Sequence, residues 1–305
     1  MAITTYAELL TALDNWTARS DLVSYTPDFI ALTEHRLHYG MDAAQFRSPP
    51  LRVRAMEAAS NLIVSAAQAG GTTTGSANAQ ASALSGFTLA VGALVTFTVG
   101  SGLTNTSATT LNVNSTGAVS VVKAPGATAL AAGDLLAGTG HVVYYDGTNW
   151  VLMPERGVPL PTDFLSLRRL YLDSDPKRSL DQLTPGDLAV KWAGSQTGQP
   201  ASFAIEADTL VFGPRSDATY TGKILYWRKI PALTASNTTN WLIANHPGVY
   251  LFGALFEAYR FIRDIDEAAA AFAQFAALVS GLQRANDLDR YGAGLLVART
   301  DTGNP

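Results

Sequence analysis

The hydrophobic positions follow a helical period near the start of the chain. Thr5 and Glu8 have the spacing of a capping box, in which each side chain bonds a free backbone N–H of the other residue. A second helix is predicted to begin at Thr26-Pro27 and to end near Tyr39, because proline is tolerated in the first turn and Gly40 stops the helix. The apolar stripes are Tyr6, Leu9, Leu10, Leu13 and Trp16 in the first helix and Phe29, Ile30, Leu32 and Leu37 in the second.

The last third of the chain has the same helical period. A short helix is predicted at 241–244, a long one from His246-Pro247 to Ile262, and another after Asp264. The acidic residues that open this last helix suit the positive end of its dipole. We expect the two long helices to pack antiparallel. Their stripes are Tyr250, Leu251, Ala254, Leu255, Ala258 and Phe261 in one and Ile265, Ala269, Phe272, Phe275, Val279 and Leu282 in the other.

Alternating hydrophobic and polar positions predict strands in the middle of the chain. Thr184-Pro185 interrupts them as the start of a short helix that ends near Trp192. Residues 65–85 are rich in Gly, Ala, Ser, Thr and Gln and are interpreted as a flexible arm or a weak strand. The predicted strands are 51–64, 94–99, 110–114, 119–122, 141–145, 150–152, 164–172, 202–206, 209–212 and 220–229.

Charge divides the chain into two parts. Between Ser65 and Leu152 only Lys123, Asp134 and Asp146 are charged, although the whole chain has 21 Lys and Arg and 25 Asp and Glu. The flanking apolar runs 61–64 and 158–161 resemble the two arms of one β-hairpin. We therefore predict a module inserted at a turn tip, where a longer loop costs only about 0.6 kcal/mol per doubling.

The predicted fold class is α+β. Residues 1–64 and 158–305 form a discontinuous domain, a helical bundle with a small antiparallel β part, and residues 300–305 form a flexible tail. Residues 65–157 form an inserted all-β domain, a sandwich or a barrel-like fold. The length of 305 residues also suggests two domains.

Composition excludes several classes of protein. The absence of cysteine excludes disulfides and thiolate metal sites and fits synthesis in a reducing cytoplasm. A formal net charge of -4 argues against a surface that binds nucleic acid phosphates. No apolar run reaches the ~18 residues that cross a membrane, and no signal peptide is recognisable, so we expect a soluble protein.

The motifs that carry catalytic or metal chemistry are weak. His35 and His38 lie one helical turn apart, as in a chelating pair, but solvated or capping histidines explain them better because no third ligand lies near. The carboxylates at 206 and 208 and those at 264, 266 and 267 are interpreted as turn and helix-cap residues rather than as a glycosidase pair. Without a nucleophile elbow or a phosphate loop either, the sequence predicts no enzyme, no metal site and no cofactor.

The tryptophans are candidates for either core or contact. Trp16, Trp192, Trp227 and Trp241 fall on apolar stripes or strands and are predicted to be core. Trp150 follows the Asp146-Gly147 turn near a possible tip of the insert, so it is either a core residue or a contact. Asp146 and Trp150 are therefore the candidates for exposed contact residues at the insert tip.

Several short motifs at the two ends of the chain form a recognisable set once the insert is removed. They are Met1 to Leu9, Trp16, Arg19 to Leu22, Pro27 to Leu32, Glu34, Arg36, Leu37, Arg52 to Glu57, Leu160 to Leu165, Ile230 to Leu233, Asn240 to Leu242 and Tyr250 to Leu255. In these motifs the chain resembles the head-to-tail adaptor proteins of tailed phages, called tail tubular protein A in short-tailed phages. The resemblance covers about 215 residues.

The insert is similar to short β repeats of phage tail-fibre proteins over about 60 residues. Its carriers are Thr96 to Val99, Leu111 to Asn114, Gly133, Asp134 and Val143 to Trp150. Typical adaptors have a short hairpin at this place. We expect the insert to project from the assembly and to contact tail fibres, neighbouring subunits or capsid.

The resemblance implies a structural virion protein, made in the host cytoplasm, that forms a ring, usually dodecameric, between the portal and the tail tube or nozzle (tail tubular protein B). Genomic DNA would pass through the ring without sequence-specific binding, and no membrane is involved. The portal-contact candidates are Leu295, Leu296, Val297, Thr300 and Pro305. The alternatives are a tail-associated peptidoglycan hydrolase and a carbohydrate-binding tail accessory protein.

Overall fold

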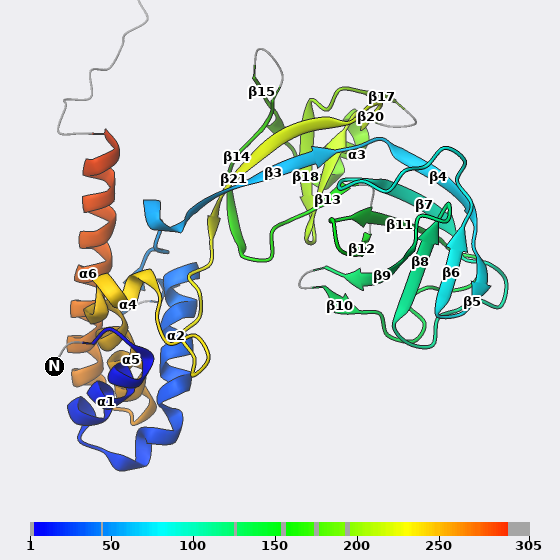
Figure 1. The fold of residues 1–305 in the computed structure, drawn as a ribbon. Helices are drawn as coiled ribbons and strands as arrows, with labels where there is room; N and C mark the ends of the chain where they lie inside the picture. Colours follow the sequence, from blue (N-terminus) through cyan, green and yellow to red (C-terminus); the bar gives the residue numbers. More distant parts are fainter. Residues whose placement is uncertain are drawn as a thin grey trace, which may run out of the picture. The chain divides into compact units, whose positions relative to one another are not determined.

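The computed structural model describes residues 3–43, 45–124, 127–153, 157–173, 177–192 and 196–291. Helices and strands are both abundant, so the predicted α+β class is confirmed. The chain forms two compact units (Figure 1). The helical unit comprises Met1–Glu57 and Trp227–Pro305, and the β unit comprises Ala58–Tyr226.

The helical unit brings the two ends of the chain together around one buried helix. Helix α5 packs against α1, α2, α4 and α6, and it lies between α2 and α6 (Figure 1). Nine of its residues are buried, from Val249 to Ala258. Its elements are α1 (Tyr6–Thr17), η1 (Ser20–Tyr25), α2 (Thr26–Tyr39), β1 (Met41–Asp42), β2 (Arg47–Ser48), η2 (Arg54–Met56), α4 (Trp241–Asn245), α5 (Pro247–Phe261) and α6 (Ile265–Tyr291).

The local signals at the helix ends are those that the sequence predicts. Both bonds of the capping box are present, with Glu8 N–H donating to Thr5 Oγ1 at 3.4 Å and Thr5 N–H donating to Glu8 Oε2 at 3.0 Å. Helix α2 ends at Gly40, where φ is +77° and a Cβ would lie 2.7 Å from the carbonyl oxygen of Ser48. Glycine is required there because the backbone turns in the left-handed region against β2.

The β unit contains one large mixed sheet made by the predicted insert. Its order is β4-β7-β11-β12-β9-β8-β6-β5, with β10 paired to β9. Gly71 N–H donates to the carbonyl oxygen of Ala83 at 3.3 Å, so the chain at the end of β4 meets the chain at the end of β6. The strands are β4 (Ala67–Thr72), β5 (Thr74–Ser76), β6 (Ala79–Ser82), β7 (Leu94–Thr98), β8 (Thr109–Val113), β9 (Ala118–Lys123), β10 (Thr128–Ala129), β11 (Gly140–Tyr145) and β12 (Trp150–Met153).

Smaller sheets complete the β unit. Two four-stranded sheets have the orders β15-β14-β21-β3 and β13-β19-β18-β16, and β17 pairs with β20. Their elements are β3 (Glu57–Val64), β13 (Gly157–Pro159), β14 (Phe164–Leu172), β15 (Arg178–Ser179), β16 (Asp181–Gln182), α3 (Pro185–Lys191), β17 (Thr197–Gly198), β18 (Ser202–Glu206), β19 (Thr209–Gly213), β20 (Arg215–Ser216) and β21 (Tyr220–Arg228).

The two apolar runs that flank the insert do not form a hairpin, so that prediction is wrong. Strand β3 is the edge partner of β21, whereas β13 pairs with β19 in a different sheet. Strand β3 is followed after two residues by β4, which pairs with β7 in the large sheet. The predicted insert therefore begins at the end of an extended strand, β3, and not at the tip of a turn. Residues 65–85 contain three strands rather than one weak strand.

One buried cluster contains residues of the insert together with residues that flank it. Leu62 and Val158 lie in the same cluster as Leu94, Tyr144 and Met153. The compact units accordingly divide the chain after residues 57 and 226. The domain boundaries predicted after residues 64 and 157 stay a prediction about which segment was inserted.

Candidate interaction surfaces

A buried polar network fixes the loop that precedes α4 in the helical unit. Leu233 N–H donates to Glu34 Oε1 at 2.8 Å, and the Tyr250 hydroxyl donates to the same oxygen at 3.1 Å. Asn240 Nδ2 donates to the Tyr250 hydroxyl and to the carbonyl oxygen of Pro231, both at 2.8 Å. The network therefore joins α2, α5 and the loop through groups whose hydrogen bonds are satisfied.

The same network explains why the two histidines of α2 are not a metal pair. Ile230 N–H donates to His38 Nε2 at 2.8 Å, so that nitrogen is engaged and unprotonated. Burial, followed by the positive charges of Lys229 and Arg52, lowers the pKa of His38 to about 4. His35 is exposed, with its ring 4.8 Å from that of Tyr39. Within the described part of the chain, no group of three metal-ligating side chains occurs.

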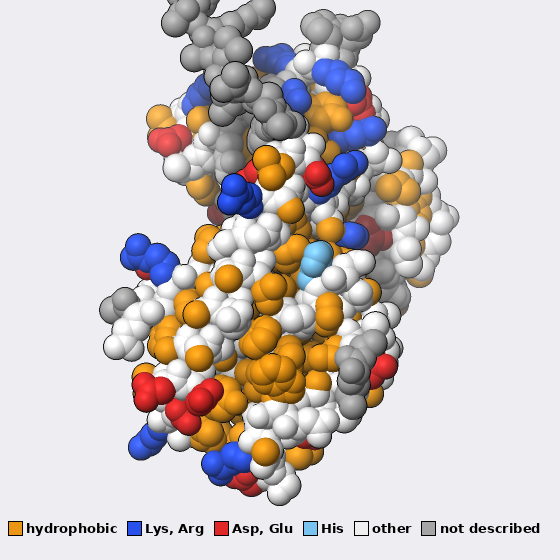
Figure 2. Space-filling model, turned by 90° about the vertical axis from the view of Figure 1, so that its left-hand side faces the viewer, with side chains coloured by type: hydrophobic (Ala, Val, Ile, Leu, Met, Phe, Trp, Pro, Cys, Tyr) orange, Lys and Arg blue, Asp and Glu red, His pale blue; other side chains and the backbone are white. Residues whose placement is uncertain are grey.

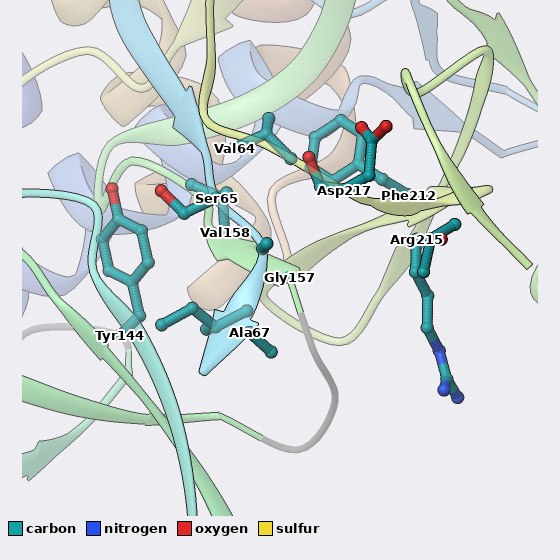
Figure 3. A pocket seen from close by; sticks show the side chains of 13 residues that line it. Val64, Ser65, Ala67, Tyr144, Gly157, Val158, Phe212, Arg215 and Asp217 are labelled. Carbon is teal, nitrogen blue, oxygen red and sulfur yellow. The ribbon is translucent and has the colours of Figure 1, made fainter. Parts of the chain in front are cut away.

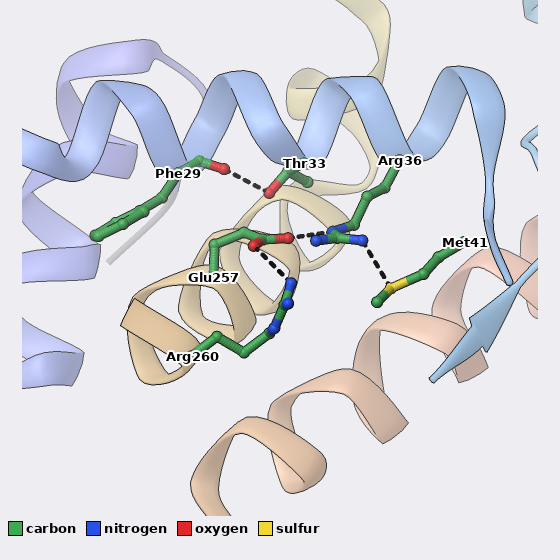
Figure 4. Close-up of polar contacts among 6 residues, drawn as sticks. All are labelled: Phe29, Thr33, Arg36, Met41, Glu257 and Arg260. Carbon is green, nitrogen blue, oxygen red and sulfur yellow. Dashed lines mark hydrogen bonds and ion pairs between the residues drawn. The ribbon is translucent and has the colours of Figure 1, made fainter. Parts of the chain in front are cut away.

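An ion-pair cluster joins α2 to α5 (Figure 4). The Arg36 guanidinium pairs with Glu257 Oε1, and Arg260 Nη1 lies 3.5 Å from Glu257 Oε2. Arg36 Nη1 also lies 2.7 Å from the sulfur of Met41. Glu257 is buried, so its charge is compensated by two guanidinium groups inside the helical unit. These groups hold the helices in place and leave no free catalytic carboxylate there.

Two of the acidic residues that the sequence sets aside as structural have structural contacts, one through its carboxylate and one through its backbone. Asp264 Oδ1 accepts a hydrogen bond from Glu267 N–H at 3.2 Å at the start of α6. The backbone oxygen of Asp208, in the turn between β18 and β19, accepts a hydrogen bond from Leu160 N–H at 2.8 Å. The predicted cap role of Asp264 is thus confirmed.

Exposed apolar side chains lie on one face of α2. Tyr25, Asp28, Leu32, His35 and Tyr39 are exposed at spacings of three and four residues, and we call this set the α2 ridge. Leu32 is 47% exposed and Tyr39 57% exposed. The prediction that Leu32 faces the core is therefore wrong.

A second exposed apolar face runs along α6. Ala270, Ala273, Ala277, Gly281 and Leu288 are exposed at spacings of three, four and seven residues, and we call this set the α6 stripe. Figure 2 looks at the side on which Figure 1 draws α6, and it shows hydrophobic side chains gathered between charged groups at the two ends. By length and composition alone, the segment Ile265–Arg290 is apolar enough to cross a membrane, and 28% of its most apolar window is buried.

A third patch lies beside the α6 stripe. The Trp16 ring packs edge-on against Phe252 with 5.7 Å between ring centroids, and Leu278 lies next to Gly248 on α5. Trp16 is 55% exposed, so the prediction that it is a core residue is wrong. The helical period identifies a helix face but does not tell whether another chain covers it.

The match to a family of known proteins concerns the part of the chain that ends with these helices. The model of the SU10 adaptor protein family matches residues 132–298, more than half of the chain. The chain belongs to the SU10 adaptor protein family. This adaptor is accordingly a structural phage protein and a component of the virion that interacts with other head or tail proteins. It matches none of the curated proteins with which it was compared.

The family match leaves the finer predictions open. It begins inside the predicted insert, at its last two long strands, and includes all of α4, α5 and α6. The resemblance of the adaptor to tail tubular protein A, and that of the insert to fibre repeats, therefore stay predictions. The portal-contact candidates Leu295, Leu296, Val297, Thr300 and Pro305 lie outside the described residues.

The adaptor's two candidate tip residues have different surroundings. Trp150 is 1% exposed and packs against Phe87 and Tyr145 in the core of the large sheet. Of the two alternatives for this residue, core is therefore confirmed, and its place among the exposed contact candidates is wrong. Its position in β12, opposite Tyr145 of β11, explains the burial. Asp146 is exposed, and its Oδ1 accepts hydrogen bonds from Thr148 and Asn149 N–H, both at 2.7 Å. Asp146 thus shapes the turn, and its role as a contact stays a prediction.

The adaptor's β unit contains a cavity of about 420 Å³ (Figure 3). Tyr144 lies on one side of it, and Phe212, Arg215 and Asp217 lie on the other. Burial, followed by the charge of Asp146, raises the pKa of Tyr144 to about 12, so its hydroxyl keeps its proton near neutral pH. The lining combines aromatic surface with one cation and one anion, which can hold a neutral polar ligand.

Proposed function

We propose that this adaptor forms a closed ring, of about a dozen copies, between the portal and the tail nozzle, with the genome passing through its channel. The proposal rests on the match to the SU10 adaptor family over residues 132–298. It is supported by the helical unit, which is held rigid by satisfied polar groups and still exposes apolar faces to other chains. A ring connector needs such faces and needs no catalytic constellation.

We assign the remaining segments to other contacts of the ring. The segment 295–305 is proposed to dock on the portal, because its apolar start would gain most by burial against another protein. The insert, including the exposed Asp146, is proposed to project from the ring towards fibres or capsid. Its low charge and its Thr, Ser and Asn surface fit a contact module rather than a channel wall.

Portal docking tests the role of the C-terminal segment. A chain that ends at residue 294 should lose binding to purified portal protein, whereas a chain that ends at residue 299 should keep most of it, because it retains Leu295, Leu296 and Val297. Equal helical content by circular dichroism would show that both variants fold. Full binding by the chain that ends at residue 294 would contradict this assignment.

The hydrolase alternative requires a carboxylic acid that faces a substrate in a cleft. Burial raises the pKa of Glu34, but its Oε1 already accepts hydrogen bonds from Leu233 N–H and the Tyr250 hydroxyl. This geometry favours a structural role. A zymogram on host cell walls separates the two functions, and a clearing zone that disappears in a Glu34→Gln variant would support the hydrolase.

The carbohydrate-binding alternative is favoured by one observation, the cavity lined by Tyr144 and Phe212 in the β unit. Aromatic walls with a few polar groups suit a sugar ring. Binding of host surface glycans to the full chain, reduced at least about tenfold by Phe212→Ala, would support this function, given that one well-placed aromatic contact is worth roughly 1.5 kcal/mol. If the Phe212→Ala variant binds the glycans as tightly as the wild-type chain does, the cavity is excluded as the glycan-binding site.

A further inference from the structure

The α6 stripe is a face on which another helix can approach closely. No charged residue occurs between Glu267 and Arg284, and the four positions of the stripe in between are alanine and glycine. The exposed side chains of Gln274, Leu278 and Ser280 lie beside them. The other face of α6 is already used, since Ala268, Phe272, Phe275 and Val279 are buried. Small side chains let two helix backbones come close together and form a shallow groove rather than a ridge.

The α2 ridge has the complementary shape. Its large members Tyr25, Leu32 and Tyr39 are spaced seven residues apart, about 10 Å along the helix, and each leaves close to half of its side chain exposed. Together they expose about 300 Å² of apolar surface, the size at which patches on monomers are often functional. A row of large knobs on one helix fits a groove of small residues on another.

The two faces lie on opposite sides of the same helical unit. Helix α5 separates α2 from α6, so neither face can reach the other within one chain (Figure 1). On the face of the stripe, Asp266 lies four residues before Ala270 and Arg284 lies three residues after Gly281. The charge that would complement Asp28 of the ridge is therefore that of Arg284. Neither has an ion pair among the described residues of the chain. Two different, complementary faces on opposite sides of one subunit make head-to-tail contacts, which form a ring where the rotation between neighbours closes.

From this arrangement we propose that the α2 ridge of one copy of the chain packs into the α6 stripe of the next copy. The inference deepens the proposed ring, on which it rests, by naming the surfaces that join its subunits. The occupant of each face is therefore a second copy of this chain. The area that the ridge can bury is well below the ~800 Å² that each partner buries in a standard interface. A dimer held by one such contact is therefore weak. Closing the ring gives each copy two such contacts.

A lipid surface fits the α6 stripe less well. Helices that lie in a membrane interface are rich in Lys and Arg on their polar face. The acidic residues Asp266 and Glu267 begin α6, and Asp287 and Asp289 lie near its end, where Arg284 and Arg290 are the basic residues. Anionic lipid headgroups would meet more negative than positive charge along this helix.

Cross-linking of single-cysteine variants tests the contact, because the natural chain has no cysteine. Leu32→Cys and Ala277→Cys chains, each alone and then mixed, are treated with a short bifunctional maleimide at high protein concentration, with and without purified portal protein. The mixture should give at least about tenfold more cross-linked dimer than either variant alone, because an assembled interface raises the effective concentration of the two thiols. Ser236→Cys, in an exposed loop, replaces each partner in turn as the control and should give no increase.

The outcomes separate this inference from the proposed function. If Leu32→Cys alone gives as much cross-linked dimer as the mixture, two ridges face each other in a two-fold contact, and the inference is overturned. Rings seen by native mass spectrometry without cross-linking in the mixture would also overturn it and would leave the ring intact. Absence of both rings and cross-links, with portal present, would remove the proposed function as well.

Charge substitutions provide a second test, which does not depend on the length of the cross-linker. Leu32→Asp and Ala277→Asp should each abolish ring formation while the thermal unfolding of the monomer stays unchanged, because both side chains are exposed. Ser236→Asp, in an exposed loop of the helical unit, is the control and should leave ring formation unchanged. Rings in both variants would contradict the proposal. If the wild-type chain floats with anionic vesicles and the Ala277→Asp variant does not, the stripe is assigned to a lipid surface instead.

Discussion

The helical unit and the β unit differ in where they place large apolar side chains. In the described part of the β unit, the exposed large apolar residues are Val91, Leu136 and Val190. Nine are exposed among the described residues of the smaller helical unit: Trp16, Val23, Tyr25, Leu32, Tyr39, Phe261, Ile265, Leu278 and Leu288. The β unit therefore completes its cores by itself, whereas the helical unit leaves apolar surface for other chains.

The polar groups inside the two units differ in kind. The buried polar residues in the described ranges of the β unit are neutral: Thr73, Gln80, Ser82, Asn105, Thr109, Ser202 and Thr209. The helical unit also buries the ionisable side chains of Glu34, His38 and Glu257. Acid should therefore weaken the helical unit before it weakens the β unit.

The largest effect is expected from a pair of tryptophan substitutions. Trp150→Ala removes a fully buried ring from the β unit and should lower its free energy of unfolding by about 3 to 5 kcal/mol. Trp16→Ala removes a half-exposed ring and should change the stability of the monomeric helical unit by under about 1 kcal/mol. Hydrogen exchange with mass spectrometry reads each unit separately. If the two substitutions lower the free energy of unfolding of their units equally, the two units do not differ in the way described.

The next effect concerns the buried charges of the helical unit. Glu257→Ala leaves Arg36 and Arg260 without their carboxylate and should destabilise the helical unit by about 3 kcal/mol. Asp21→Ala, which breaks the exposed pair with Arg19, is the control and should cost under about 1 kcal/mol. Urea unfolding followed by the helical signal measures both. A small cost for Glu257→Ala would show that Arg36 finds another partner.

A pH dependence should be larger in the helical unit than in the β unit, where desolvation also lowers the pKa of His141. The folded-state pKa of His38 is lowered to about 4, so between pH 6.5 and pH 4 the unfolded chain binds a proton that the folded chain excludes. Stability should fall as the pH is lowered through this window, by up to about 3 kcal/mol, and not above it. Glu34, whose pKa burial raises, opposes part of this loss.

A His38→Gln variant isolates the histidine from the other groups. Its side-chain oxygen can still accept the hydrogen bond from Ile230 N–H, but it does not titrate. The difference in free energy of unfolding between pH 7 and pH 4.5 should shrink in this variant. An unchanged difference would mean that the acid sensitivity arises elsewhere.

The smallest effect compares the two threonine caps. Thr5→Ala breaks the capping box of α1 in the helical unit, and Thr184→Ala breaks the bond from Asp187 N–H to Thr184 Oγ1 at α3 in the β unit. Each should cost about 1 kcal/mol. Thr5→Ala should cost more, because the Glu8 carboxylate also loses the geometry that bonds Thr5 N–H. The reverse order, measured by urea unfolding, would show that tertiary contacts and not caps hold α1.

The sequence predicts the local features of this fold well. The capping box at Thr5, the stop at Gly40 and the strand limits at 202–206 depend on neighbouring residues, and the structure has them. The hairpin at the insert failed because strand pairing joins distant segments, here β3 with β21 and β13 with β19. Similar apolar runs do not encode which strands pair.

The candidate surfaces could be located from sequence only in part. Periodicity identifies the apolar faces of α1 and α2 but cannot tell that Trp16 and Leu32 lie outside the monomer core. The stretch from Ala268 to Gln283, which has no charged residue, is a signal that would have revealed the α6 stripe. Trp150 was misplaced because a nearby turn suggests exposure, whereas its strand register puts it in the core.

Imaging of the protein in complex with its portal tests the central claim most directly. We expect a closed ring in which α2 of each copy lies against α6 of the next, and we expect Leu32→Asp chains to form no ring. Copies attached to the portal singly, or joined only through their β units, would contradict it.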